Sequence, residues 1–156
     1  MDEILELARL AEEIWREYYI SIITIEQIDY MINQFQSVPA IELQIQQGYE
    51  YYLIRYLNRS VGYLSVKVEP SRKLFLSKFY IGKEYRGRGY ASLTMAFLKR
   101  LCAERELSHI WLTVNRHNEP SIKIYEKMGF KIEREQVADI GNGFVMDDFI
   151  MEWHHR

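Results

Sequence analysis

The sequence predicts an α/β domain in which helices flank a mixed, mostly antiparallel sheet. Its 156 residues are a usual length for one domain, and its 48% apolar and 27% charged residues are typical of globular proteins. Residues 3–48 have helical periodicity, residues 49–81 have the texture of short strands, and residues 73–114 run strand, loop, helix, strand. This composition excludes a disordered, collagen-like or coiled-coil chain. We therefore expect a single domain over residues 1–156.

Three helices are expected in the first part of the chain. Apolar residues spaced three and four apart predict an amphipathic helix over residues 3–19. Thr24 can cap a second helix, with Gln27 as its capping-box partner. Pro39 can open a third, short helix, and Gly48 can end it in the left-handed conformation.

Three strands should follow as an antiparallel meander. Aromatic and branched residues predict strands over residues 49–57, 61–68 and 73–81. The turns between them are too short for a parallel crossover, so neighbouring strands should run in opposite directions.

Helices and strands alternate in the second half. Residues 90–104 are predicted to be helical and residues 109–114 to form a buried strand, so the helix can make a parallel crossover. The helix residues expected to face inward are Leu93, Ala96, Phe97 and Leu101.

A helix and a hairpin complete the expected elements. A short helix over residues 119–128 should end at Gly129. Strands over residues 130–138 and 144–152 should be joined at Asn142-Gly143, a strong hairpin signal.

Composition excludes several classes of protein and site. The single cysteine, Cys102, rules out an internal disulfide or a cysteine-rich zinc site, and the histidines lack metal-ligand spacing, so no metal is expected. The net charge of −2 argues against a general nucleic-acid binder. No long apolar run or secretory signal is present, so we expect no membrane span and a cytoplasmic location.

The charge is unevenly distributed along the chain. Residues 1–52 carry ten acidic and two basic residues, whereas residues 53–156 carry twelve acidic and eighteen basic ones. This pattern favours one end that attracts a cation and another that attracts an anion. It is equally consistent with acidic residues that simply solvate the outer face of the first helix.

The most informative stretch is the loop from Tyr85 to Ser92, between a predicted strand and a predicted helix. Its glycines, Gly87 and Gly89, let the backbone turn tightly and approach a ligand. The first amides of the following helix have no partners inside it and can hold phosphate, and Arg86 and Arg88 add positive charge.

Three other interpretations fit parts of this loop. A dinucleotide-binding G-x-G-x-x-G loop is disfavoured because the run from Gly87 ends in Ser92 and follows a meander. A nucleotide P-loop starting at Gly82 has Arg88 and Gly89 where a lysine and a hydroxyl are needed. A plain glycine turn into a helix remains the structural alternative.

A family resemblance separates these interpretations. Arg86-x-x-Gly89-x-Ala91 resembles the [Q/R]-x-x-G-x-[G/A] loop of the GNAT superfamily of N-acetyltransferases, which cradles the pyrophosphate of acetyl-CoA. About thirty residues on, the stretch from Asn118 to Phe130 looks like the family's N-x-x-[A/S]-x-x-x-Y-x-K-x-G-F helix. The resemblance extends over residues 3–153.

The resemblance implies a GNAT-type sheet with a splayed parallel strand pair and assigns roles to individual residues. The backbone of strand 73–81 should pair with the pantetheine arm, and the amides of residues 87–92 should take the pyrophosphate. Tyr125 matches the family's general acid, which gives a proton to the departing thiolate of CoA. The residues expected at the cofactor are Phe79, Tyr80, Ile81, Arg86, Gly87, Arg88, Gly89, Tyr90, Ala91, Ser92, Asn118, Ser121 and Lys127.

The chain departs from the family pattern in two respects. Many members place a glutamate on the splayed strand as the base, but strand 73–81 contains no carboxylate. Glu26, Asp29 and Glu42 are candidates to attract a cationic amine, although each also fits an ordinary surface acid. The family's first strand is absent from the expected elements, which leaves a sheet edge either exposed or covered by a partner chain, so a homodimer is one option.

Two functions from different classes follow from these features. The first is an acetyl-CoA-dependent N-acetyltransferase that acts on the primary amine of a small cationic molecule or a peptide. The stretch from Ile140 to Glu152 resembles that of bacterial polyamine and small-molecule members. The second is a non-catalytic CoA-binding regulatory or interaction module, suggested by the missing strand glutamate.

Overall fold

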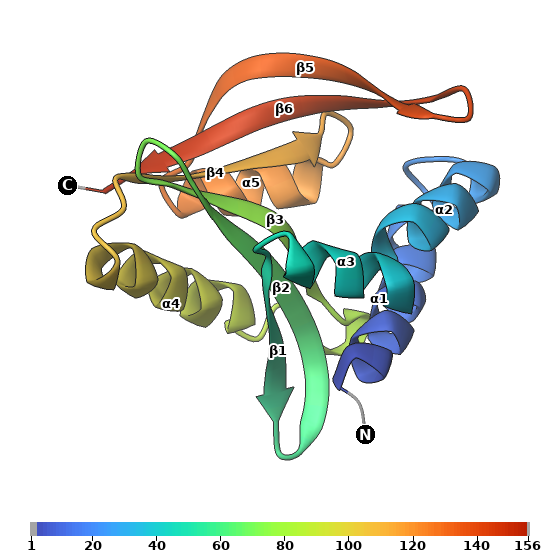
Figure 1. Ribbon diagram of the computed structural model, residues 1–156, viewed down its shortest axis with the longest axis horizontal. Helices are drawn as coiled ribbons and strands as arrows, with labels where there is room; N and C mark the ends of the chain where they lie inside the picture. The colour runs from blue at the N-terminus through green and yellow to red at the C-terminus, as the bar shows by residue number, and fades with distance from the viewer. Residues whose placement is uncertain (1–2, 156) are drawn as a thin grey trace. The chain divides into compact units, whose positions relative to one another are not determined.

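The computed structural model describes residues 3–155 and has the expected order of elements (Figure 1). The helices and strands are α1 (Glu3–Tyr19), α2 (Ile25–Met31), the π-helical η1 (Ile32–Gln36), α3 (Val38–Gln46), β1 (Glu50–Tyr56), β2 (Arg59–Glu69), β3 (Lys73–Ile81), the 3₁₀ turn η2 (Lys83–Tyr85), α4 (Tyr90–Glu104), β4 (His109–Asn115), α5 (Glu119–Lys127), β5 (Lys131–Gly141) and β6 (Phe144–His154). Every predicted helix and strand is present, with boundaries shifted by a few residues at most.

The six strands form one mixed sheet in the order β1-β2-β3-β4-β6-β5. The β1–β2, β4–β6 and β5–β6 pairs are antiparallel, whereas β3 and β4 are parallel. The parallel register covers only Lys73–Phe75 of β3 and His109–Trp111 of β4. Both strands continue beyond this short register, as expected of a splayed pair.

The chain divides into two compact units. One contains the residues up to Lys67 together with Lys78–Tyr90, and the other contains Val68–Ser77 together with the residues from Ala91 onward. The strand β3 therefore contributes its first residues to the second unit and its last residues to the first. The expectation of a single domain stays a prediction.

The first unit has a core between its helices and strands. Leu7, Ala11 and Ile14 of the amphipathic α1 form a buried cluster with Ile41 of α3 and Tyr63 of β2. Thr24 caps α2 by accepting a hydrogen bond from the Gln27 amide at 3.1 Å, as predicted. Ser37 caps α3 in the same way, with Pro39 in its first turn.

The second unit buries a different stripe of α4 from the expected one. Leu101 is buried as predicted, but Leu93 is 69% exposed and Ala96 is also exposed. The buried residues of α4 are Thr94, Met95, Leu98, Leu101 and Cys102. Both stripes contain apolar residues, but the stripe that packs also includes the polar Thr94, so its pattern of apolar residues is interrupted. The prediction that Leu93 and Ala96 face inward was wrong for this reason.

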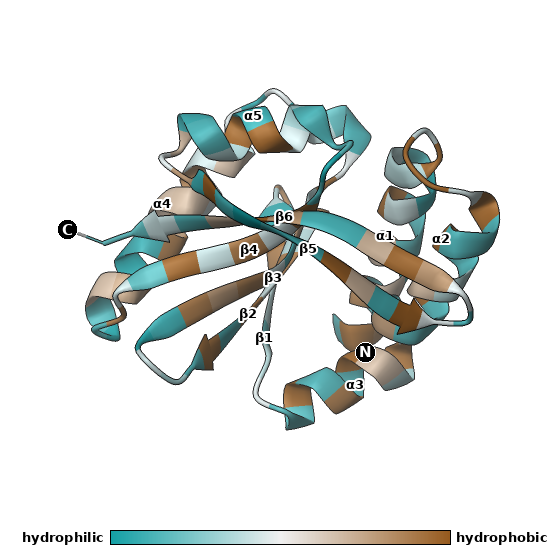
Figure 2. Ribbon diagram, turned by 90° about the horizontal axis from the view of Figure 1, so that it is seen from above, coloured by the Kyte–Doolittle hydropathy of each residue, from teal (hydrophilic) through white to brown (hydrophobic). Residues whose placement is uncertain are grey.

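The hairpin β5–β6 turns where it was predicted to turn. Gly141 pairs with Phe144, and both Asn142 (φ 55°) and Gly143 (φ 78°) have the left-handed backbone that a two-residue hairpin needs. Figure 2 shows hydrophobic residues toward the tip of this hairpin and hydrophilic ones nearer its other end.

Candidate active site

The loop between β3 and α4 has an open backbone surface. Gly82 begins the η2 turn, and its amide donates to the Val61 carbonyl at 2.8 Å. Gly87 and Gly89 follow with φ of +77° and +88°, and a Cβ built on either would meet nothing within 4 Å. The left-handed conformation explains the glycines, and the open space leaves the loop backbone accessible to a ligand.

The two arginines of this loop have different surroundings. Arg86 donates from Nε to the Ile81 carbonyl at 2.9 Å, and its other two nitrogens meet the Glu17 carboxylate of α1 at 3.1 and 2.6 Å. Its guanidinium also lies 4.8 Å from the centre of the Tyr18 ring. Arg86 therefore joins the loop to α1. Arg88 is exposed, with its guanidinium 5.9 Å from the centre of the Tyr85 ring.

The last residues of β3 are supported by an aromatic cluster. Tyr80 contacts the rings of Trp15, Tyr19 and Tyr63 at centroid distances of 5.5, 6.0 and 5.5 Å. A Cβ on Gly62 would lie 2.4 Å from the Tyr80 carbonyl oxygen, so this glycine permits β2 to approach β3 closely. These contacts fix the backbone of Phe79–Ile81 beyond the parallel register.

The second predicted motif forms α5, as expected. Asn118 is 3% exposed and caps the helix by accepting a hydrogen bond from the Ser121 amide at 3.4 Å. Tyr125 is partly buried and its ring lies 5.6 Å from that of Phe130, whereas Lys127 is exposed. Gly129 ends the helix with φ of +97°, which fits its predicted role.

The predicted residues are divided between the two units. The group Phe79, Tyr80, Ile81, Arg86, Gly87, Arg88, Gly89 and Tyr90 lies in the first unit. The group Ala91, Ser92, Asn118, Ser121, Tyr125 and Lys127 lies in the second. The first motif, from Arg86 to Ala91, thus crosses from the first unit into the second, whereas the second motif lies entirely in the second unit.

Sequence reasoning did not single out Lys78, a buried lysine of β3. The residue is 7% exposed, and its ammonium group donates to the Phe35 carbonyl, to Gln44 Oε1 at 2.9 Å and to Tyr51 Oη at 2.5 Å. Burial lowers its pKa to about 7. In the sequence its only signal is its period-two position after Leu74 and Leu76, which places it on the buried side of β3.

A buried acid in the second unit was also missed. Asp148 of β6 is 3% exposed, and among residues 3–155 no donor reaches its Oδ1. Burial is the main cause that raises its pKa to about 6; the neighbouring Asp147 raises it further and a hydrogen bond from Thr113 lowers it. An acidic residue within a predicted strand gives no sequence signal for such burial.

The acidic residues considered for amine binding are all exposed. Asp29 forms an ion pair with Arg16 at 2.6 Å, and Glu26 and Glu42 lie on the outer surfaces of α2 and α3. These positions fit ordinary surface acids.

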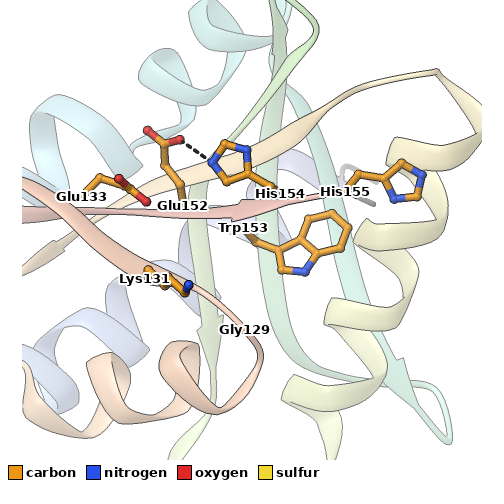
Figure 3. A pocket seen from close by; sticks show the side chains of 7 residues that line it. All are labelled: Gly129, Lys131, Glu133, Glu152, Trp153, His154 and His155. Atoms are coloured by element: carbon orange, nitrogen blue, oxygen red, sulfur yellow. Dashed lines mark ion pairs between the residues drawn. The ribbon is translucent and has the colours of Figure 1, made fainter.

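A pocket of ≈ 510 Å³ lies in the second unit (Figure 3). It is lined by Gly129, Lys131, Glu133, Glu152, Trp153, His154 and His155. An ion pair at 3.2 Å joins Glu152 to His154, and His154 pairs in register with His109, the first residue of β4. The pocket therefore lies at the end of β4 away from the start of α5.

Two further kinds of feature are absent from the part of the chain that the structure describes. No helix within residues 3–155 combines the length and apolar character needed to cross a membrane. Over the same residues, no set of three or more histidine, cysteine or acidic side chains is arranged to hold a metal ion.

Comparison with known proteins gives consistent matches. The sequence model of the Acetyltransferase (GNAT) family matches residues 7–130. An uncharacterized N-acetyltransferase of Mycobacterium tuberculosis is 32% identical over 96 residues, which are 59% of this chain and 62% of that protein. YycN of Bacillus subtilis, also an uncharacterized N-acetyltransferase, is 32% identical over 74 residues, 46% of this chain and 47% of that protein. The match thus spans less than two thirds of these relatives.

Solved structures share the fold. The PaiA N-acetyltransferase from Thermoplasma acidophilum, solved in complex with coenzyme A, has a TM-score of 0.81 at 22% identity. That alignment covers 98% of this chain and 93% of the other. A GNAT-family acetyltransferase from Elizabethkingia anophelis with acetyl-CoA bound has a TM-score of 0.62 at 15% identity, over 75% of this chain and 84% of that one.

Proposed function

This chain belongs to the GNAT family of acetyltransferases, and we propose from that membership that it transfers an acetyl group from acetyl-CoA to a primary amine. The acceptor is the amine of a small cationic molecule or of a peptide. The observation that carries the proposal is the open, left-handed backbone at Gly87 and Gly89, directly before α4.

The loop residues suit the diphosphate of the cofactor. The first amides of α4 have no partners within the helix, and the helix dipole favours negative charge at this end. The open space at Gly87 and Gly89 lets the diphosphate approach those amides. Arg88 is exposed and can add a charge-assisted contact, while Arg86 holds the loop through Glu17.

The end of β3 suits the pantetheine arm. The parallel register with β4 stops at Phe75, so the backbone of Phe79, Tyr80 and Ile81 lies beyond it. The edge of a splayed strand can pair with an extended chain, and the amides of the pantetheine arm can form such a pairing here. The cluster around Tyr80 keeps this backbone in place.

The helix α5 supplies the acid. The amine attacks the thioester carbon, and CoA leaves as a thiolate that needs a proton or a hydrogen bond. In this proposal Tyr125 gives that proton. Asn118, buried at the helix cap, fixes the position of α5, and Ser121 and Lys127 contribute to cofactor binding.

The proposal is tested by blocking the loop with a side chain. Gly89→Val should abolish binding of acetyl-CoA in calorimetry, because a branched side chain would fill the space that the diphosphate needs. Gly143→Val is the matched control: its φ of +78° is similar and its surroundings are equally open, but it lies in the β5–β6 turn. Both variants bear similar backbone strain, so only a specific loss at Gly89 supports the proposal.

A second assay separates an enzyme from a binding module. Thiol release from acetyl-CoA is followed with polyamines, aminoglycosides and short peptides as acceptors. An amine that accelerates release supports the transferase. Binding of acetyl-CoA without any accelerating amine would favour the non-catalytic module, and absence of binding would contradict both.

A further inference from the structure

The proposed transfer needs a group that takes a proton from the acceptor. An ammonium has no lone pair, and β3 offers no carboxylate. Several carboxylates of the described chain are already held by arginines: Glu17 by Arg86, Asp29 by Arg16, and Asp147 by Arg116. A base has to be sought among acids that are not held in this way.

Asp148 has the surroundings of such a base. Its side chain is buried, and its Oδ1 has no donor among the described residues. A buried carboxylate oxygen without a partner destabilises the fold, so its presence calls for an explanation outside stability. With a pKa raised to about 6, the carboxyl group is ionised at pH 7. Its pKa is also close enough to pH 7 for it to accept and release a proton.

The position of Asp148 in the sheet connects it to the second motif. Asp148 pairs in register with Asn115, the last residue of β4, four residues beyond the end of the parallel register at Trp111. The Asn115 carbonyl accepts a hydrogen bond from the amide of Asn118, the cap of α5, at 2.9 Å. Asp148 therefore lies at the end of β4 from which the helix carrying Tyr125 begins.

Asp148 and α5 lie on opposite faces of the strands. On β6, Trp153 lies against Gly129, at the end of α5, and under Lys99 of α4. Side chains alternate along a strand, and five positions separate Asp148 from Trp153. Asp148 thus faces away from α5. This suits acyl transfer, in which the amine approaches one side of the thioester carbon and the thiolate departs on another.

Three influences act on the pKa of Asp148: burial and Asp147 raise it, and Thr113 lowers it. Asn115 of β4 and Gln136 of β5 lie opposite it in register, and Thr113 donates to its side chain. The nearby charged residues are Asp147, Arg116 and Glu135. Arg116 forms ion pairs with Asp147 at 2.8 Å and with Glu135 at 2.6 Å.

We propose that Asp148 is the base that removes a proton from the acceptor ammonium, an inference that rests on the proposed function. The Asp148 carboxylate takes one proton, and the nitrogen lone pair forms the C–N bond. The C–S bond then breaks with its electron pair on sulfur. After attack the nitrogen loses a second proton, which restores the proton that Tyr125 gives to the thiolate. The proton on Asp148 passes to water. The acceptor ammonium and acetyl-CoA thus give amide, thiol and one released proton.

The test compares Asp148→Asn with Asp147→Asn in thiol release from acetyl-CoA across pH 5–9, using the panel of polyamines, aminoglycosides and short peptides. Asp148→Asn should lower kcat/KM by about 10²-fold at pH 7.5. It should also remove the fall in kcat/KM below about pH 6, the acid limb of the pH profile, and change the Kd of acetyl-CoA by less than about twofold. Asp147→Asn should keep the rate at pH 7.5 and keep the acid limb, moved to lower pH because Asp147 raises the pKa of Asp148.

A stability measurement gives an independent readout. The folded state binds the Asp148 proton more tightly than the unfolded chain, so ionisation destabilises the fold increasingly from about pH 4 to 6 and fully above it. Asp148→Asn should therefore raise the Tm by several degrees at pH 7.5 and not at pH 4.

The outcomes distinguish the two proposals. A rate and acid limb like those of Asp147→Asn, even with a raised Tm, would overturn the role of Asp148 and leave the transferase standing. Acetyl-CoA binding with no amine turned over by the unaltered protein would overturn both.

Discussion

Lys78 shows how a single side chain can oppose the stability of its own fold. Its ammonium group is buried among the Phe35 carbonyl, Gln44 and Tyr51, and the causes of its shifted pKa include no neighbouring carboxylate. Hydrogen bonds satisfy the donors, but burial without a counter-charge disfavours the charged form. Stability should therefore depend on pH through this residue.

The Lys78→Met variant tests this pH dependence. The folded state binds the Lys78 proton less tightly than the unfolded chain does. The loss of folding free energy caused by this residue is therefore largest below pH 7 and decreases as the pH rises toward 10.5. The difference in unfolding free energy, Lys78→Met minus unaltered protein, should fall by up to about 1.4 kcal/mol per pH unit in that window. Urea denaturation at pH 6, 7.5 and 9 measures it, with Lys83→Met as an exposed control. A difference that stays constant above pH 7 would contradict the burial argument.

Tyr125 is the residue on which the proposed chemistry depends most directly. Removal of its hydroxyl in Tyr125→Phe should lower kcat by about 10²-fold, since the thiolate loses its proton donor. The Kd of acetyl-CoA should change by less than about twofold, because the ring and its contact with Phe130 remain. Tyr49→Phe, directly before β1, is the control for loss of a phenol. Equal rates for both variants would remove Tyr125 from the mechanism.

At the scale of elements, the loop before α4 is held by a contact between residues far apart in the chain. Arg86 and Glu17 are 69 positions apart, and their ion pair is about one third exposed on each side. Arg86 also holds the Ile81 carbonyl, so one side chain closes the turn and joins it to α1. This arrangement gives Arg86 a positioning role for the loop before α4.

Loss of the carboxylate should loosen the loop. Glu17→Ala is expected to raise the Kd of acetyl-CoA by about tenfold, because the bidentate pair that orders the turn is lost. Glu13→Ala removes an exposed acid from the same helix and should leave the Kd unchanged. Calorimetry measures both. Tighter binding by Glu17→Ala would show instead that Arg86 serves the cofactor better when released.

At the scale of the whole molecule, the acidic excess of the first third of the chain is partly neutralised by folding. Glu6, Glu17 and Asp29 meet Arg55, Arg86 and Arg16 at 3.1, 2.6 and 2.6 Å. Two of these arginines come from the basic remainder of the sequence. The uneven charge is therefore as much a source of contacts as an attraction for a cationic acceptor, and the cytoplasmic location and homodimer stay predictions.

Much of the fold could be predicted because local patterns carry it. The spacing of apolar residues in α1, the cap at Thr24 and the Asn142-Gly143 turn depend on neighbouring residues, and the structure confirms all three. The stripe of α4 could not be predicted in the same way. Hydropathy favoured Leu93, whereas packing buried Thr94 and Leu98, and only the surrounding elements decide between two stripes of one helix.

By itself, the sequence determined the order of the elements, the glycine loop with its cofactor signature, and the motif helix that carries Tyr125. These depend on backbone conformation and on residues close together in the chain. Only the tertiary structure decided that Lys78 and Asp148 are buried and that Arg86 is held by Glu17. Burial and pairing are set by residues distant in sequence, and they change the charge and reach of a side chain without changing its local pattern.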